Sequence, residues 1–224
     1  MRNFFFTSFL LPLITIFFIA VAPIGCTKKL TKTFVAYEND FERQGQATVV
    51  IYDYYGLVTT SRIFDFNGSK VLGPFNNNAV NFTTKNIPDH NVLEISFDLY
   101  IHDSWQGNLK ASNGVPDLFV IKYDENPKFV TTFSNHSLYK QAYPQWYSAA
   151  DNPTYANALE IKLPGRCLWK DSAQGTSFYK IVESFGHNTD SFKLTLSDAL
   201  QPFGSICDKS WSIDQLKITA FKYY

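Results

Sequence analysis

The sequence has no excess of either charge and lacks the commonest catalytic motifs. Lys plus Arg and Asp plus Glu number 20 each in 224 residues, and neither a Gly-x-Ser-x-Gly elbow nor a phosphate-binding Gly-rich loop occurs. The four His residues lie outside any recognisable nucleophile or metal-binding motif. A charge-balanced chain has no broad electrostatic attraction for nucleic acid or for an anionic membrane surface. We therefore expect no nucleic-acid partner.

Helical periodicity is also missing: beyond the N-terminal segment, no ten residues in a row show it cleanly. Aromatic residues make up 17% of the chain, and aromatic and β-branched residues favour strands. The clearest strand lies within residues 93–108, where polar residues alternate with Leu93, Ile95, Phe97, Leu99 and Ile101. Alternation places one apolar and one polar face on a strand, which is typical of an antiparallel sheet covered on one side.

Further short strands are predicted along the rest of the chain, separated by turn residues such as Asn67-Gly68, Gly73-Pro74 and Asn113-Gly114. They lie at 47–52, 80–83, 118–123, 129–133, 159–163, 178–182, 192–197 and 216–220. Many short strands with polar turns and no internal repeat indicate an all-β domain, an antiparallel β-sandwich or jelly roll, over residues 37–224.

The N-terminus reads as a targeting segment, because Arg2 precedes a nearly continuous apolar run over residues 4–22. Its length would also suit a transmembrane anchor, but a small residue before a lone Cys favours a cleaved signal peptide over residues 1–25. Pro23-Ile24-Gly25-Cys26 resembles the lipobox of bacterial lipoproteins. That resemblance implies a lipid on Cys26 and a cell-envelope location, at the outer membrane if the source has one. The residues that follow read as a short polar tether, over 26–36. The alternative is an ordinary signal peptide with an incidental Cys.

Two further cysteines, Cys167 and Cys207, remain in the mature chain. An exported protein meets an oxidising compartment, so they form either a disulfide or two buried free thiols. No other Cys or His stands near either one at ligand spacing, and zinc is therefore not expected.

Acidic residues stand near both ends of the predicted domain. Asp214 is separated from Leu216 and Ile218 by an even number of positions, so on a regular last strand its carboxylate would share their apolar face. Burying a carboxylate there is costly unless it is paired or bound to a metal. Calcium binds six to eight hard oxygen ligands. Asp40, Glu42 and Asp214 are a candidate calcium site if the first and last strands are neighbours; alternatively, Asp214 accepts backbone N–H groups.

Several short pieces carry a family resemblance. They are residues 39–42, 71–75, 87–90, 97–108, 116–117, 132–135 and 210–218, in that order. Together they resemble the concanavalin/laminin-G-like jelly rolls of exported bacterial proteins. The resemblance implies a jelly-roll architecture, with calcium or carbohydrate binding as common uses of such folds. The chain departs from this group at Lys209, Ser212 and Gln215, where the group tends to have Glu, Gly and Asn.

The polar loop that follows the clearest strand is a second metal candidate. Asp103, Asn108 and Asp117 offer oxygen ligands around two glycines, although their spacing does not match an EF-hand. The alternative is a solvated loop whose Asp residues cap turns.

Aromatic residues gather between positions 139 and 155. We predict that a ligand binds to Tyr143, Trp146 and Tyr147 of this stretch and to Trp105, which lies outside it in the sequence; Tyr139 and Tyr155 belong to the same stretch. The reason is that flat rings can stack on the faces of sugars. The alternative is that these rings pack beneath a long loop.

Together these features predict a membrane-anchored lipoprotein with a non-catalytic domain that binds a glycan, with calcium as the candidate cofactor. One alternative is a structural or adhesive subunit that meets another envelope protein. Another is a hydrolase or lyase acting on polysaccharides, for which Glu94 and Asp98 are the nearest approach to a carboxylate pair on one face.

Overall fold

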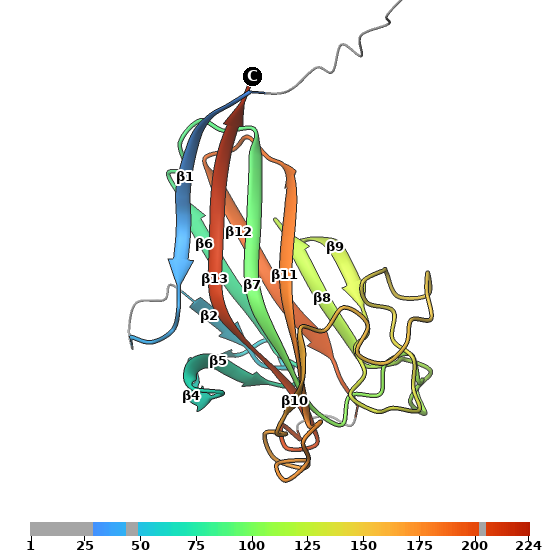
Figure 1. The fold of residues 1–224 in the computed structure, drawn as a ribbon. Helices are drawn as coiled ribbons and strands as arrows, with labels where there is room; N and C mark the ends of the chain where they lie inside the picture. The colour runs from blue at the N-terminus through green and yellow to red at the C-terminus, as the bar shows by residue number, and fades with distance from the viewer. Residues whose placement is uncertain (1–28, 44–48, 202–204) are drawn as a thin grey trace, which may run out of the picture.

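The structure is a computed structural model that describes residues 29–43, 49–201 and 205–224. The described chain forms two antiparallel β-sheets that face one another (Figure 1). This confirms the predicted all-β sandwich. The predicted signal peptide over residues 1–25 and the predicted lipid site at Cys26 lie outside the described residues. Within the described residues, no helix is long and apolar enough to span a membrane.

The larger sheet has seven strands. Their order from one edge is β10 (Glu160–Leu163), β11 (Thr176–Gly186), β7 (Val92–Asp103), β13 (Lys209–Tyr223), β5 (Ser69–Phe75) and β4 (Ile63–Phe66), and β1 (Leu30–Asn39) also pairs with β13. The pairing of β1 with β13 makes the first and last strands neighbours, as predicted. It also corrects the predicted tether over 26–36, because residues 30–36 belong to β1 and make sheet pairs.

The smaller sheet has six strands. Their order is β3 (Val58–Thr59), β2 (Val49–Tyr52), β6 (Ala79–Lys85), β12 (Ser191–Ala199), β8 (Leu118–Tyr123) and β9 (Asn126–Thr131). Every pairing in both sheets is antiparallel between described residues.

The core lies between the sheets and is built by alternation. The apolar residues of β7, from Leu93 to Ile101, are at most 1% exposed at every second position. From the other sheet they meet a buried aromatic and aliphatic layer that includes Phe82, Phe119 and Leu194. The alternation seen in the sequence therefore gives the correct inner face for this strand.

Alternation fails at one point in β13. The register of β13 against β7 shifts between Asp214 and Lys217, and Gln215 has a left-handed φ of 53°. The shift indicates a β-bulge, which moves the following side chains to the opposite face. Trp211 and Ile213 before it, and Leu216 and Ile218 after it, all join the core. Asp214 consequently lies on the outer face, and its predicted place on the apolar face is wrong.

The predicted turn at Gly73-Pro74 is also wrong, because both residues lie inside β5. A side chain at position 73 would place its Cβ 2.8 Å from the Cβ of Ser212 on the neighbouring strand, and φ there is +146°. Glycine is required here for the close approach of β5 to β13, and not for a change of chain direction.

The long connections gather at the end of the sandwich away from the C-terminus (Figure 1). Residues 132–159 join β9 to β10, and residues 164–175 join β10 to β11. A disulfide between Cys167 and Cys207 ties the second connection to the segment before β13. The structure thus joins the two cysteines, as the first of the two sequence interpretations proposed.

Candidate ligand-binding site

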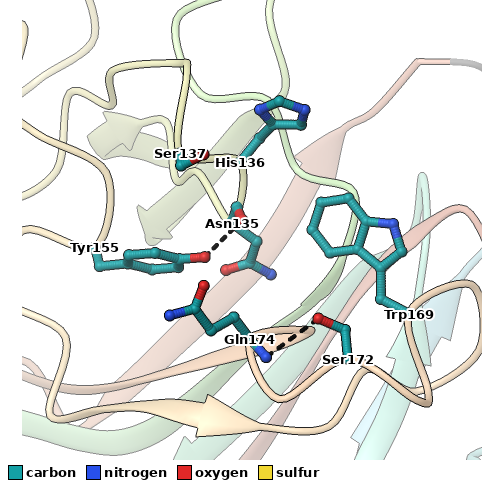
Figure 2. Close-up of a pocket in the computed structure, with 7 residues that line it drawn as sticks. All are labelled: Asn135, His136, Ser137, Tyr155, Trp169, Ser172 and Gln174. Atoms are coloured by element: carbon teal, nitrogen blue, oxygen red, sulfur yellow. Dashed lines mark hydrogen bonds between the residues drawn. The ribbon is translucent and has the colours of Figure 1, made fainter.

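An open depression lies between the two long connections and has a volume of about 240 Å³. Figure 2 shows Trp169 and Tyr155 on opposite sides of it, with Asn135 between them and His136 at the rim. It is lined by Asn135, His136, Ser137, Tyr155, Trp169, Ser172 and Gln174. None of these residues carries a carboxylate, ammonium or guanidinium group.

The aromatic rings of the depression are held in fixed positions. The hydroxyl of Tyr155 donates to the carbonyl of Asn135 at 2.6 Å. The ring of His136 lies 4.6 Å from that of Tyr139 and 6.2 Å from that of Trp169, between ring centroids. Tyr155 and Trp169 are both half-buried, so each ring has one part packed and another facing the solvent.

Polar groups complete the lining. Ser137 and Gln174 are exposed, and no described residue makes a hydrogen bond with either side chain. Asn135 differs, because its side-chain amide is buried and donates to the carbonyls of Ile101 and Asp103 at 2.7 and 3.0 Å. Asn135 therefore fixes the floor, while the amide and hydroxyl at the rim remain able to bind a ligand.

Asp103 holds the connection that carries Trp169. Its Oδ1 accepts the backbone N–H groups of Cys167 at 3.2 Å and Trp169 at 2.9 Å. Gly165 has no room for a side chain, since a Cβ there would lie 2.5 Å from that same oxygen. Burial raises the pKa of Asp103, while the backbone amides oppose the rise. The residue predicted as a metal ligand therefore anchors a loop.

Gln141 holds the opposite wall of the depression. Its side chain is fully buried, and its Oε1 accepts the backbone N–H groups of Ser134 at 3.1 Å and Tyr155 at 3.2 Å. Its Nε2 donates to the carbonyl of Ala156 at 3.1 Å. A single amide thus joins both ends of the connection over residues 132–159, which makes the wall rigid without regular secondary structure.

The three residues of the loop metal candidate bind separate protein partners. Asp117 pairs with the ammonium group of Lys209 at 2.9 Å. The Nδ2 of Asn108 donates to Asp151 at 2.6 Å, and Asp103 accepts the backbone groups described above. As arranged here, the set does not fit a calcium ion, because one carboxylate already has a cation and the others have internal donors.

The strand-end metal candidate is brought together only in part. Ser69 Oγ lies 2.8 Å from Glu42 Oε1 and 2.7 Å from Asp214 Oδ2, so it bridges these two carboxyl groups. Asp40 is exposed and accepts the backbone N–H of Glu42 at 3.2 Å. Over the described ranges, no group of three or more His, Cys, Asp or Glu side chains is placed to hold a metal ion. Calcium binding stays a prediction.

The predicted aromatic residues are scattered. Trp105 is fully buried and donates its Nε1–H to the carbonyl of Ser210 at 2.8 Å, so its assignment to ligand binding is wrong. Tyr143 packs on Phe133 at 4.8 Å between ring centroids. Trp146 is 46% exposed, and Tyr147 lines a separate depression beside Asn108. None of the four lines the Trp169 depression.

The carboxylate pair considered for catalysis has structural partners. Asp98 forms an ion pair with Lys180 at 2.8 Å, and Glu94 accepts the hydroxyl of Ser184 at 3.1 Å. Both lie on the outer face of β7, away from the Trp169 depression.

Sequence reasoning missed most of this site. Tyr155 falls within the aromatic stretch that the sequence indicates, but Trp169 lies in a different connection, beyond β10. The nearest signal was the pair of cysteines, because Cys167 stands two residues before Trp169 and a disulfide often fixes an exposed loop.

No family model matches the chain, and no curated protein matches it significantly. Among solved structures, it is similar to a family 35 carbohydrate-binding module from Clostridium thermocellum, at 11% identity over 77% of this chain and 98% of that chain, with a TM-score of 0.34. It is also similar to the C-terminal CBM6 of LamC, a marine laminarinase from Zobellia galactanivorans, at 8% identity, 77% and 99% coverage and a TM-score of 0.34.

A third similar structure is an exo-β-1,3-galactanase from Phanerochaete chrysosporium, at 10% identity and a TM-score of 0.33, where the match covers 77% of this chain and 29% of that chain. These scores are too low to support an argument about function. The architecture of this chain therefore rests on its own strand pairing.

Proposed function

We propose that this protein is a non-catalytic binding domain for a neutral glycan, and that the depression between Trp169 and Tyr155 is its sugar site. The observation that carries the proposal is the lining itself: two partly exposed aromatic rings and several uncharged hydrogen-bonding groups, all on fixed loops. Ligand sites generally combine flat apolar walls with a few polar groups that set orientation.

The chemistry of a sugar ring matches this lining. Its C–H face can stack on an aromatic ring, and its hydroxyls can both donate and accept hydrogen bonds. Trp169 and Tyr155 supply the rings, while the amide of Gln174 and the hydroxyls of Ser137 and Ser172 supply donors and acceptors. The volume of about 240 Å³ is below the roughly 300–1,000 Å³ of pockets for drug-sized ligands. We therefore expect only a short part of a chain to enter.

Binding is tested with the full-length protein in detergent on an array of cellulose, xylan, laminarin, galactan and starch fragments, followed by calorimetry. Trp169→Ala should weaken binding by about tenfold or more, which corresponds to about 1.4 kcal/mol. Trp146→Ala is the matched control, because Trp146 is also exposed but lies outside the depression, and it should bind like the parent. Absence of binding to every fragment, or equal binding by Trp169→Ala, would contradict the proposal.

We also propose that a lipid on Cys26 anchors the domain to a membrane of the cell envelope. Support comes from the Pro-Ile-Gly-Cys motif after an apolar segment, and a multiply acylated Cys would hold the protein stably. Cells fed a labelled fatty acid should label the parent protein, and Cys26→Ala should abolish the label. A labelled Cys26→Ala protein, or an unlabelled parent, would contradict the anchor.

A further inference from the structure

A second aromatic surface is presented by the turn between β2 and β3. Tyr54 is 60% exposed and Tyr55 is 82% exposed, and their ring centroids are 5.4 Å apart. These rings border a depression of about 310 Å³, which also receives Arg62, Ile206 and the asparagines at 76–78. Large aromatic side chains with this much exposure commonly mark interaction sites.

The turn that carries both tyrosines is held by its own hydrogen bonds. Asp53 Oδ1 accepts the backbone N–H groups of Tyr55 at 3.0 Å and Leu57 at 2.8 Å, and the carbonyl of Asp53 accepts the N–H of Gly56 at 2.9 Å. A turn that is ordered before binding loses little conformational entropy when a ligand arrives. The backbone that carries the two rings is therefore ordered before a ligand arrives.

The three asparagines at the floor of this depression already donate to backbone carbonyls of the protein. The side chain that remains able to donate to a ligand is that of Arg62. Asn76 Nδ2 donates to the carbonyl of Lys209 at 2.9 Å, Asn77 Nδ2 to that of Leu200 at 3.0 Å, and Asn78 Nδ2 to that of Tyr52 at 3.2 Å. In the part of the chain that the structure describes, Arg62 belongs to no ion pair. Its guanidinium group can donate several hydrogen bonds to ligand oxygens.

The disulfide connects this surface to the Trp169 depression. Ile206 lines the tyrosine depression and precedes Cys207, while Trp169 follows Cys167 by two residues. The Cα atoms of the two cysteines are 4.8 Å apart, so those of Trp169 and Ile206 are separated by no more than about 16 Å, given 3.8 Å between consecutive Cα atoms. The bridge is closed further by the N–H of Leu168, which donates to the carbonyl of Cys207 at 3.1 Å.

We propose that one glycan chain occupies both surfaces, with one part in the Trp169 depression and another against Tyr54, Tyr55 and Arg62 after crossing the disulfide. This inference rests on the proposed function and adds the class of ligand: an extended polymer, rather than a single sugar or a chain terminus. Two contacts at a fixed short separation raise the affinity for any chain long enough to reach both.

The test measures affinity against fragment length by calorimetry, with a size series of whichever of the array polysaccharides binds. In the parent protein, affinity should rise by about tenfold or more once the fragment reaches both surfaces, as expected for two linked contacts. The double variant Tyr54→Ala/Tyr55→Ala should lose that rise and still bind short fragments like the parent. Val58→Ala is the control, because Val58 is 69% exposed on the same hairpin but does not line the depression.

The outcomes separate the two proposals. If affinity does not depend on length, or if the double tyrosine variant keeps the full rise while Trp169→Ala weakens binding, the second surface is refuted and the first site stands. If no fragment binds the parent, both proposals fall. Tyr54→Phe/Tyr55→Phe, which keeps the rings, should keep the rise. Unchanged binding of short fragments by the double alanine variant excludes a loss caused by misfolding.

Discussion

Lys209 Nζ lies 2.9 Å from Asp117 Oδ2, and the two side chains are only 3% and 4% exposed. Asp117 also accepts the backbone N–H of Gln106 at 3.0 Å, so its carboxylate accepts hydrogen bonds from both an ammonium group and a backbone amide. Lys209 stands where the jelly-roll group that this chain resembles tends to have Glu. The ammonium group thus provides a positive charge at a carboxylate for which the sequence alone predicted a metal.

Removing that ammonium group should be strongly destabilising. We expect Lys209→Met to lower the free energy of unfolding by about 3–5 kcal/mol, because it leaves a buried carboxylate unpaired. The matched control is Lys180→Met, whose ion pair with Asp98 involves a lysine that is 47% exposed, and its loss should cost at most about 1 kcal/mol. Urea unfolding measures both. Equal losses for the two variants would mean that the Lys209 pair contributes no more than a surface pair.

Asp214 and Glu42 share one hydroxyl, and this predicts a stabilising substitution. Ser69 Oγ contacts both carboxyl groups but has a single proton to donate. Burial raises the pKa of Asp214, and the charges of Asp98 and Glu42 add to the rise. A raised native pKa means that stability is lost as pH rises through it.

We therefore expect Asp214→Asn to gain about 0.5–1.5 kcal/mol at pH 7 and little or nothing at pH 4. The new amide can donate to Ser69, which then donates to Glu42. The existing bond from the N–H of Gln215 to Oδ1, 2.7 Å long, is kept. Asp65→Asn serves as a control, since Asp65 is 85% exposed. A loss of stability at pH 7 in Asp214→Asn would show that the charged form is the favoured one.

Chelation tests the calcium prediction directly. The candidate ligands have protein partners in the structure, so we expect EDTA to leave the melting temperature unchanged. A bound structural ion would instead stabilise the native state by mass action, and its removal would lower the melting temperature. A decrease that excess calcium reverses, and magnesium does not, would establish the ion that the sequence analysis proposed.

The sequence predicted the sandwich because most of its strands alternate cleanly. Nine predicted strands correspond to β2 and to β6 through β13, whereas β1, β3, β4 and β5 were missed. Half of the residues of β1 are apolar, but they do not alternate regularly with the polar ones, and most of the strand is exposed. The sequence therefore shows no periodic apolar pattern there. At Gln215 a one-residue bulge reversed the faces, and parity counting has no means to detect such a shift.

The binding site was harder to predict because its residues come from connections without periodicity. Trp105 and Trp169 are both tryptophans that follow a strand, so the sequence alone does not distinguish a buried ring from an exposed one. Trp105 lies in the core, where its indole N–H donates to the carbonyl of Ser210. Trp169 lines a depression, because its loop is anchored by Asp103 and by the disulfide. Contacts between residues far apart in the chain thus decide whether each ring is exposed, and the residues next to each Trp in the sequence do not reveal them.

Asp198 predicts a defined pH dependence of stability. Its Oδ1 accepts the indole N–H of Trp211 at 2.9 Å and the backbone N–H of Asn78 at 3.1 Å, and its Oδ2 accepts the backbone N–H of Asn77. Burial raises the pKa of this carboxyl group to about 6, compared with about 3.9 in an unfolded chain. Between those values the native state binds more protons than the unfolded state, so the free energy of unfolding falls as pH rises.

The loss from this one group should approach, and not exceed, about 3 kcal/mol between pH 4 and 7, since each pKa unit corresponds to 1.36 kcal/mol and the residue is partly exposed. Asp198→Asn has no proton to release, so the difference in unfolding free energy between parent and variant should change with pH by that amount. Using the difference removes the contribution of exposed acids whose pKa is lowered, such as Asp89 and Glu160. Parallel curves for the two proteins, measured by urea unfolding, would show that Asp198 is already charged at pH 4.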